Sequence, residues 1–380
     1  MPYPAAMKRN ARGVPFPGCS WLRTVGVHLL GCGLLLCCGT FAHAAEYPTP
    51  KQADFVIHDF SFQTGEKLPD LRMHYRTVGS PLRDTQGVVT NAVLILHGTT
   101  GQGGNFIRAE FAGALFGPGQ LLDATRYFIV LPDNLGHGQS SKPSDGLHAH
   151  FPQYGYRDMV AAQYRLLTEG LHITHLRLVM GTSMGGMHTW LWGGTHPEFM
   201  DALLPLASLP TQISGRNRAW RRMIIDAIRT DPEWQDGEYH QQPRGLRIAA
   251  EVLYFMASNP VLRQKEAPTR ADADRMFDAA VDASLKTLDA NDVMYALAAS
   301  RDYDPGPYLE KITAPLLAVN SADDLINPPE LGILEREIKR VKHGRASVLP
   351  LSDKTRGHGS HTIAALWQDY LAELLRESAK

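Results

Sequence analysis

The amino-acid sequence predicts an α/β fold with a mostly parallel, twisted sheet, helices on both faces and an inserted helical cap. Short apolar segments recur along the chain and are mostly separated by helix-length stretches, which is typical of a parallel sheet covered on both faces. The interval 214–304 has instead a helical pattern and no convincing strand. One apolar segment is followed directly by a serine between glycines, which indicates a tight turn from a strand into a helix.

The expected strands follow one another in two groups. Alternating side chains at 55–60 and 71–78 predict two amino-terminal strands on an antiparallel edge. Six apolar segments then predict buried strands, at 92–96, 127–131, 176–180, 202–206, 316–319 and 347–349. In a parallel sheet of this kind the active site forms at the carboxyl ends of the strands.

Helical patterns occupy the interval between the strands at 202–206 and 316–319. They predict helices at 216–230, 244–258, 269–288 and 291–299. The simplest interpretation is a cap over the active site, and a set of ordinary crossover helices is the alternative. We therefore divide the chain into a first part of the core at 45–213, the cap at 214–304 and a second part of the core at 305–380.

The amino-terminal segment differs from the rest of the chain. Four basic side chains precede or border an uncharged apolar stretch at 25–41, and Ala42-His43-Ala44 follows. This pattern predicts a signal peptide at 1–44 that is cut after Ala44, with an uncleaved anchor as the alternative. All four cysteines lie inside this segment, so the mature protein would contain no disulfide. We expect a periplasmic or secreted protein that is not attached to a membrane once the signal is removed.

Composition limits the partners and ligands. A formal net charge of −1 gives no basic field for binding nucleic acid. His148 and His150 are two residues apart, but no further metal ligands cluster with them in the sequence. We expect no metal and no cofactor.

The candidate nucleophile is Ser183, in the motif Gly181-Thr182-Ser183-Met184-Gly185. A serine on a tight strand-to-helix turn needs neighbours without bulky side chains, because the helix packs closely against the sheet. The hydroxyl group then stands clear of the sheet, and the backbone N–H of Met184 can stabilise an oxyanion.

A nucleophilic serine needs a base and a carboxylate that orients the base, and here they should follow in the order serine, acid, histidine. The loop after 316–319 supplies Asp323 and Asp324. We favour Asp324, which stands four residues before Pro328 in a D-x-I-x-P pattern that recurs at this loop in serine hydrolases. Asp323 is the alternative and would otherwise form a local turn.

The candidate base is His358, in Gly357-His358-Gly359 after the last expected strand. His361 is the alternative, although we expect Ser360 or Thr362 to open the last helix and to place His361 in its first turn. A second oxyanion donor should come from the loop after 92–96, where the backbone N–H of Thr99 is the best candidate.

Several longer segments resemble one known family. The stretch 116–128 is similar to G-P-G-x-x-L-D-x-x-R-Y-F, 157–163 to R-D-M-V-x-A-Q, 181–187 to G-G-S-M-G-G-M and 231–239 to D-P-x-W-x-x-G-x-Y. Together with the order of serine, acid and histidine, these segments resemble an α/β-hydrolase-fold enzyme of the homoserine O-acetyltransferase family. Thr182 replaces a glycine of the family motif.

The resemblance implies an acyl-enzyme on Ser183 and a small-molecule ester or acyl substrate. The carboxylate-binding arginine that the family implies in the cap has three candidates, Arg218, Arg221 and Arg222, and their spacing to Asp231 differs from the family's. The predicted signal peptide would carry the protein to a compartment without acetyl-CoA. We therefore expect an exported serine hydrolase, such as an esterase, with an acetyl-CoA-dependent O-acyltransferase as the alternative. A homodimer is compatible with the sequence.

Overall fold

The structure, a computed structural model, describes residues 47–379. The strands are β1 (Lys51–Ser61), β2 (Lys67–Val78), β3 (Ala92–Leu96), β4 (Phe128–Pro132), β5 (Leu178–Thr182), β6 (Leu203–Leu206), β7 (Leu316–Ser321) and β8 (Gly344–Leu349). The helices are α1 (Ala112–Leu115), α2 (Tyr156–Arg165), α3 (Met184–Thr195), α4 (Gly215–Arg229), α5 (Gly245–Ala257), α6 (Pro260–Glu266), α7 (Arg270–Leu285), α8 (Ala290–Ala298), α9 (Ile333–Glu337) and α10 (Gln368–Glu377).

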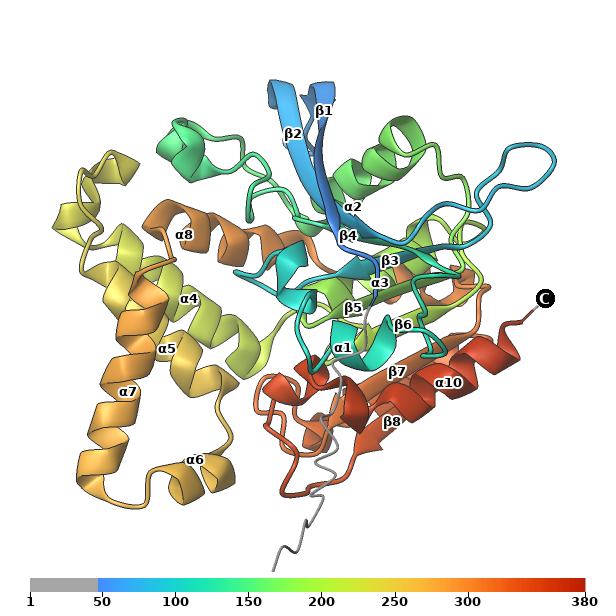
Figure 1. The fold of residues 1–380 in the computed structure, drawn as a ribbon. Helices are drawn as coiled ribbons and strands as arrows, with labels where there is room; N and C mark the ends of the chain where they lie inside the picture. The colour runs from blue at the N-terminus through green and yellow to red at the C-terminus, as the bar shows by residue number, and fades with distance from the viewer. Residues whose placement is uncertain (1–46, 380) are drawn as a thin grey trace, which may run out of the picture. The chain divides into compact units, whose positions relative to one another are not determined.

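The described strands form one sheet in the order β1-β2-β4-β3-β5-β6-β7-β8 (Figure 1). β1 and β2 form an antiparallel edge, and β2 also pairs antiparallel with β4. The other neighbouring strands are parallel. The predicted fold class is therefore confirmed, including the antiparallel amino-terminal edge.

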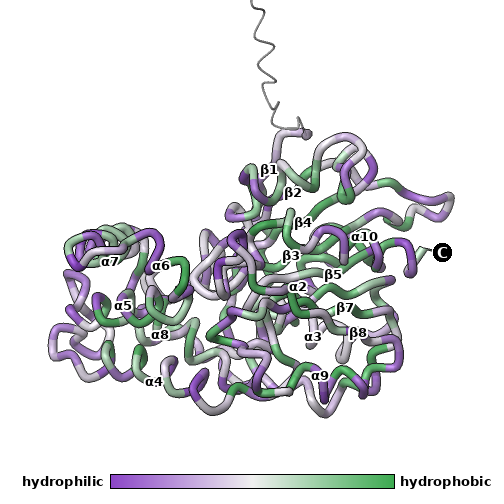
Figure 2. The backbone as a smooth tube through the Cα atoms, turned by 90° about the horizontal axis from the view of Figure 1, so that it is seen from below, coloured by the Kyte–Doolittle hydropathy of each residue, from purple (hydrophilic) through white to green (hydrophobic). Residues whose placement is uncertain are grey.

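The sheet is buried between two layers of apolar side chains. α2 and α3 contribute to the cluster on one face, and α1 and α10 to the cluster on the other. Every residue of β3, β4 and β5 is buried, and Figure 2 shows these strands as largely hydrophobic. A strand covered on both faces has no polar side, which explains why these segments are apolar throughout rather than alternating.

One strand differs from its expected position in a way that affects the site. β5 was expected at 176–180 and runs from Leu178 to Thr182. Its parallel ladder with β6 extends to the pair Thr182 and Leu206, so regular pairing continues up to the residue before Ser183. The serine is therefore held directly by the sheet.

The cap consists of α4 to α8, which lie between β6 and β7 along the chain. Four of these helices coincide with the expected ones, whereas α6 was not expected. Asn259 caps α6 by accepting from the backbone N–H of Leu262, and Pro260 occupies its first turn. The domain boundaries at 213/214 and 304/305 stay a prediction, because the described residues form one compact unit.

Two expectations concern the ends of the chain. The predicted signal peptide at 1–44 lies outside the described residues. Within 47–379, no helix is both long and apolar enough to span a membrane. The expectation that Ser360 or Thr362 opens the last helix is wrong: residues Gly359–Thr362 form a separate 3-10 turn, and α10 begins only at Gln368.

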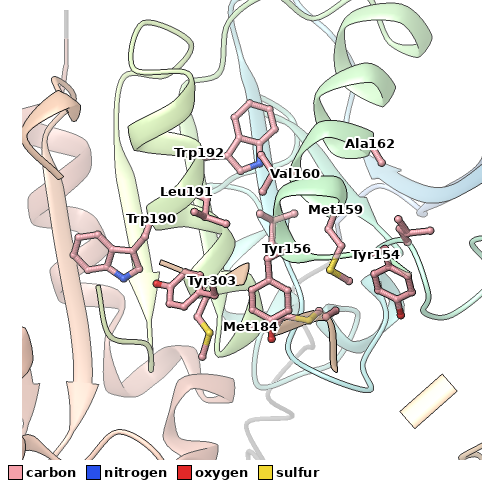
Figure 3. Packing of buried hydrophobic residues seen from close by; sticks show 14 of the residues in the cluster. Tyr154, Tyr156, Met159, Val160, Ala162, Met184, Trp190, Leu191, Trp192 and Tyr303 are labelled. Carbon is pink, nitrogen blue, oxygen red and sulfur yellow. The ribbon is translucent and has the colours of Figure 1, made fainter. Parts of the chain in front are cut away.

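The R-D-M-V-x-A-Q segment has a structural role. Asp158 accepts hydrogen bonds from the backbone N–H groups of Gly155 and Gln63, which fixes the start of α2. The Gln163 side chain accepts from the indole N–H of Trp192 at 2.7 Å, which ties α2 to α3. Figure 3 shows Trp192 and other large side chains of α3 beside those of α2. This packing holds the helix that follows Ser183.

Candidate active site

Ser183 lies on a strained turn between β5 and α3. Its backbone angles are φ 56° and ψ −113°, a region that residues with side chains rarely occupy. A Cβ on Gly181 would lie 2.2 Å from the backbone of Gly185, and a Cβ on Gly185 would lie 1.9 Å from the carbonyl oxygen of Leu96. Only glycine fits at either position, so the glycines of the motif permit the turn that presents the serine.

Three side chains from distant parts of the sequence meet at this turn. His358 Nε2 lies 2.8 Å from Ser183 Oγ, and His358 Nδ1 lies 2.8 Å from Asp324 Oδ2. Asp324 follows β7, and His358 follows β8, so all three come from the carboxyl ends of parallel strands. This arrangement lets His358 accept the serine proton while Asp324 holds the imidazole in the required tautomer.

The Asp324 carboxylate is held in its charged form although it is only 1% exposed. Burial alone would raise its pKa, but the charge of His358 and hydrogen bonds from His358, Asn327 and Ile326 outweigh burial and lower the pKa. An ionised carboxylate behind the imidazole stabilises the positive charge that His358 acquires when it takes the proton.

The two alternative residues lie next to this site but do not complete it. Asp323 accepts from the backbone N–H of Gly357 and the side chain of Asn259, and no hydrogen bond joins it to His358. His361 packs edge-on against the His358 ring, with centroids 5.1 Å apart. Burial, followed by the charge of His358, lowers the pKa of His361 to about 3, so it is neutral near pH 7.

Two backbone amides are available to stabilise an oxyanion. The N–H groups of Thr99 and Met184 donate to no other group in the described part of the chain. Met184 N–H is the first of α3, where the helix dipole also favours negative charge. A Cβ on Gly98 would lie 3.2 Å from Ser183 Cβ, so the loop that carries Thr99 approaches the serine closely.

Ser183 opens into a cavity of about 520 Å³ between the core and the cap. The core contributes the loop 97–106 and the segment 350–362 after β8, which carries His358 and is called the histidine loop below. The cap contributes α4, α5 and α7. A neighbouring cavity of about 400 Å³ shares Thr100, Gly101, Asn105, Thr287 and Leu288 with it. The two cavities therefore adjoin, and the loop 97–106 and the cap contribute to both.

The structure places the three candidate arginines of the cap differently. Arg221 lines the cavity, is 2% exposed and has its guanidinium group 4.7 Å from the Trp220 ring centroid. Its Nε donates to Asn217, whereas its Nη1 has no hydrogen-bond partner. Arg222 pairs with Asp226 on the exposed face of α4 and does not line the cavity. Arg218 does not line it either.

Three residues at this site were not predicted from the sequence. Arg108 lines the same cavity as Arg221. Burial raises the pKa of Tyr156, and the nearby charge of Arg221 partly opposes that rise. Asn259 joins the cap to Asp323. Only Asn259 had a readable signal, because Asn followed by Pro is typical of the start of a helix.

The charged side chains that line the cavity around Ser183 are positive. Arg108 and Arg221 line it, and no Asp or Glu among residues 47–379 does. Nor does this part of the chain bring three His, Cys, Asp or Glu side chains together in a group that could hold a metal ion. Anionic groups are therefore the charged ligands that this cavity favours.

Comparisons with known proteins identify relatives of the whole fold. Residues 91–343 match the family model described as alpha/beta hydrolase fold. A probable acyltransferase of Methanothermobacter thermautotrophicus is 32% identical over 278 residues, which cover 73% of this chain and 84% of the relative. A homoserine O-acetyltransferase of Moorella thermoacetica is 30% identical over 362 residues, which cover 82% of this chain and 93% of the relative.

Solved structures share the fold at lower sequence identity. A homoserine O-acetyltransferase from Bacillus anthracis has a TM-score of 0.75 at 22% identity and covers 86% of this chain and 97% of its own. An acetylester hydrolase from Corynebacterium glutamicum has a TM-score of 0.75 at 20% identity and covers 86% and 96%. The same architecture thus occurs in a transferase and in an ester hydrolase.

Proposed function

This chain belongs to the α/β-hydrolase family and groups there with the homoserine O-acetyltransferases, and we propose that it is an O-acyltransferase that works through an acyl-enzyme on Ser183. The proposal rests on the two 2.8 Å contacts that join Ser183, His358 and Asp324. The names of the curated relatives support transfer over the ester hydrolysis that the sequence favoured.

In the first half-reaction His358 takes the proton of Ser183 while Ser183 Oγ attacks the acyl carbon of a thioester or ester. The amides of Thr99 and Met184 stabilise the oxyanion, and the leaving thiol or alcohol departs with the proton from His358. In the second half-reaction His358 takes a proton from an acceptor hydroxyl group, whose oxygen attacks the acyl carbon. Ser183 then leaves with that proton.

Arg221 is the best candidate for binding an anionic group of the acceptor. Its buried guanidinium lies near Tyr156 and is held in place by Asn217 and by the ring of Trp220. A carboxylate that meets a fixed, buried guanidinium forms charge-assisted hydrogen bonds. A charged group in this position would also draw the acceptor into the cavity that holds Ser183.

Ester hydrolysis is the second candidate function, and one observation favours it. An amino acid such as homoserine carries an ammonium group as well as a carboxylate. Among residues 47–379 no carboxylate lines the cavity that contains Ser183, and Asp289 and Asp292 line only the adjoining one. Desolvating an unpaired ammonium group is costly. Without a suitable acceptor, water would deacylate Ser183, which also agrees with the predicted export of the protein.

The two functions can be separated with a matched set of acceptors. The purified protein receives acetyl-CoA, or separately p-nitrophenyl acetate, with homoserine, 4-hydroxybutanoate or butan-1-ol. The second of these acceptors is homoserine without its amino group. Transfer faster than hydrolysis, with 4-hydroxybutanoate preferred over homoserine, supports transfer to an anionic alcohol. Donor consumption that no acceptor accelerates supports hydrolysis, and no acylation of Ser183 by either donor refutes both functions.

Arg221→Met tests the acceptor site with a side chain of similar volume. Losing a charge-assisted contact worth about 1.5–3 kcal/mol weakens binding of the anionic acceptor, so its KM rises by about 10- to 100-fold. Butan-1-ol has no anionic group, and its KM stays unchanged. Arg222→Met is the matched control, because Arg222 lies on the same helix but outside the cavity.

A further inference from the structure

The carboxylate of Asp323 joins three separate segments of the chain. Its Oδ2 accepts from the backbone N–H of Gly357 at 2.9 Å and from the side-chain amide of Asn259. Its Oδ1 accepts from the hydroxyl group of Ser321. Asp323 therefore links the loop 322–328 after β7, here called the acid loop, with the histidine loop and the cap. Its Oδ2 atom contacts both the histidine loop and the cap.

Gly357 places this contact directly before His358. It has a φ of +61°, and a Cβ at this position would lie 3.3 Å from Asn259 Cβ and 3.3 Å from the carbonyl oxygen of Ser258. That spacing is tighter than ordinary van der Waals contact. The backbone of the histidine loop is thus packed against the segment of the cap that leads into α6.

Asn259 is fixed on the cap side of the contact. It is 4% exposed, and its Oδ1 accepts from the backbone N–H of Leu262 at 2.9 Å, which caps α6. Its Nδ2 is left to donate to Asp323. Arg356 and Glu266 add a second link between the histidine loop and α6, although their 3.8 Å separation and exposure make that link weak.

We propose that Asp323 is a positioning residue that clamps the histidine loop to the cap, so that docking of α6 sets the position of His358. A base must be held within about 0.5 Å of its productive position, and a displacement of about 1 Å can cost about 100-fold in rate. The clamp acts on the backbone one residue before His358. The position of the cap and the placement of the base are therefore linked through one carboxylate.

Substitutions of Asp323 test the clamp by steady-state turnover of p-nitrophenyl acetate, with active sites counted from the burst of p-nitrophenol. Asp323→Ala lowers kcat per active site by about 10- to 100-fold and leaves KM within about 3-fold. Asp323→Asn keeps kcat within about 3-fold, because its amide oxygen can still accept from Gly357 and Asn259 and its amide nitrogen can donate to Ser321. If Asp323 only stabilises the fold, Asp323→Ala lowers Tm but not kcat per active site, which overturns the proposal.

Asn259→Ser tests the same clamp from the cap. Serine still caps α6 but is too short to reach Asp323, so kcat falls as it does in Asp323→Ala. The double variant is no worse than Asp323→Ala alone, because both changes break one interaction. Additive losses, or a fully active Asn259→Ser, overturn the proposal even if Asp323→Ala does not fold. Failure of the unmodified protein to become acylated on Ser183 would refute the proposed function, a result distinct from a failure of the clamp.

Discussion

Asp324→Asn is the sharpest test of the triad, because the structure dictates how the new amide must orient. Asp324 Oδ1 accepts from the backbone N–H groups of Ile326 at 2.8 Å and Asn327 at 3.1 Å. Two fixed donors require an oxygen atom at that position. Those two donors outweigh the longer 3.4 Å contact from the Asn327 side-chain amide to Oδ2, so the amide nitrogen takes the position of Oδ2 and faces Nδ1 of His358, 2.8 Å away.

The size of the effect follows from the tautomer of His358. An amide N–H that faces Nδ1 forces the imidazole proton onto Nε2, the atom that must accept the proton of Ser183. A base fixed in the wrong tautomer costs about 10³- to 10⁴-fold in rate. Converted at about 1.4 kcal/mol for each tenfold, the loss is about 4–5.5 kcal/mol of transition-state stabilisation.

The assay is steady-state turnover of p-nitrophenyl acetate by purified Asp324→Asn, with Tm measured alongside. We expect kcat to fall by about 10³- to 10⁴-fold while KM changes by less than about 3-fold. Asp323→Asn is the matched control, since it makes the same chemical change one residue earlier. A loss below about 10-fold, or a larger loss in Asp323→Asn, would show that Asp324 is not the orienting acid.

Three further predictions concern backbone strain and pH. Gly185→Ala destabilises the protein by about 3 kcal/mol or more and abolishes acylation of Ser183, because the added Cβ would lie 1.9 Å from the Leu96 carbonyl oxygen. Urea unfolding measures the stability and burst titration the acylation. A variant with native stability and activity would contradict the close contact between Gly185 and Leu96. Burial, the largest cause, lowers the pKa of His97 to about 4 and of His137 to about 3. The unfolded chain therefore binds more protons below pH 6.5, and stability falls as the pH drops from 6.5 toward 4. A Tm that is flat over this range in Asp292→Asn, which lacks the opposing carboxyl group, would refute this. Burial, the largest cause, raises the pKa of Asp292 from 3.8 to about 6. The unfolded chain therefore loses this proton first, and stability falls by about 1–3 kcal/mol as the pH rises from 4 to 6. Asp292→Asn removes that loss when urea unfolding is measured across this pH range.

The sheet and the three candidate residues of the triad could be predicted because each depends on local sequence. A strand covered on both faces must be apolar, and a serine at φ 56° needs glycines around it, so both features are visible in consecutive residues. Asp324 and His358 follow from the order of the strands. Ser183 comes within 2.8 Å of His358 across 175 positions of sequence, a distance that no local pattern encodes.

The lining of the cavity could not be predicted, because it depends on how the cap packs. Arg218, Arg221 and Arg222 lie on one helix, yet of these three only Arg221 lines the cavity that contains Ser183. Their positions along the helix do not show how α4 is rotated about its axis. The role of Asp323 was hidden for the same reason, since its partner Asn259 lies 64 residues away in the cap.

The order of strands in the sheet also determines when a growing chain could first become active. β5 pairs with β3 and β6, so the turn that carries Ser183 can form before the end of the chain exists. Asp324 and His358 follow β7 and β8, the last two strands at one edge. A chain that stops short of His358 would hold its serine without a base. The catalytic group is therefore complete only when the final edge of the sheet has been added.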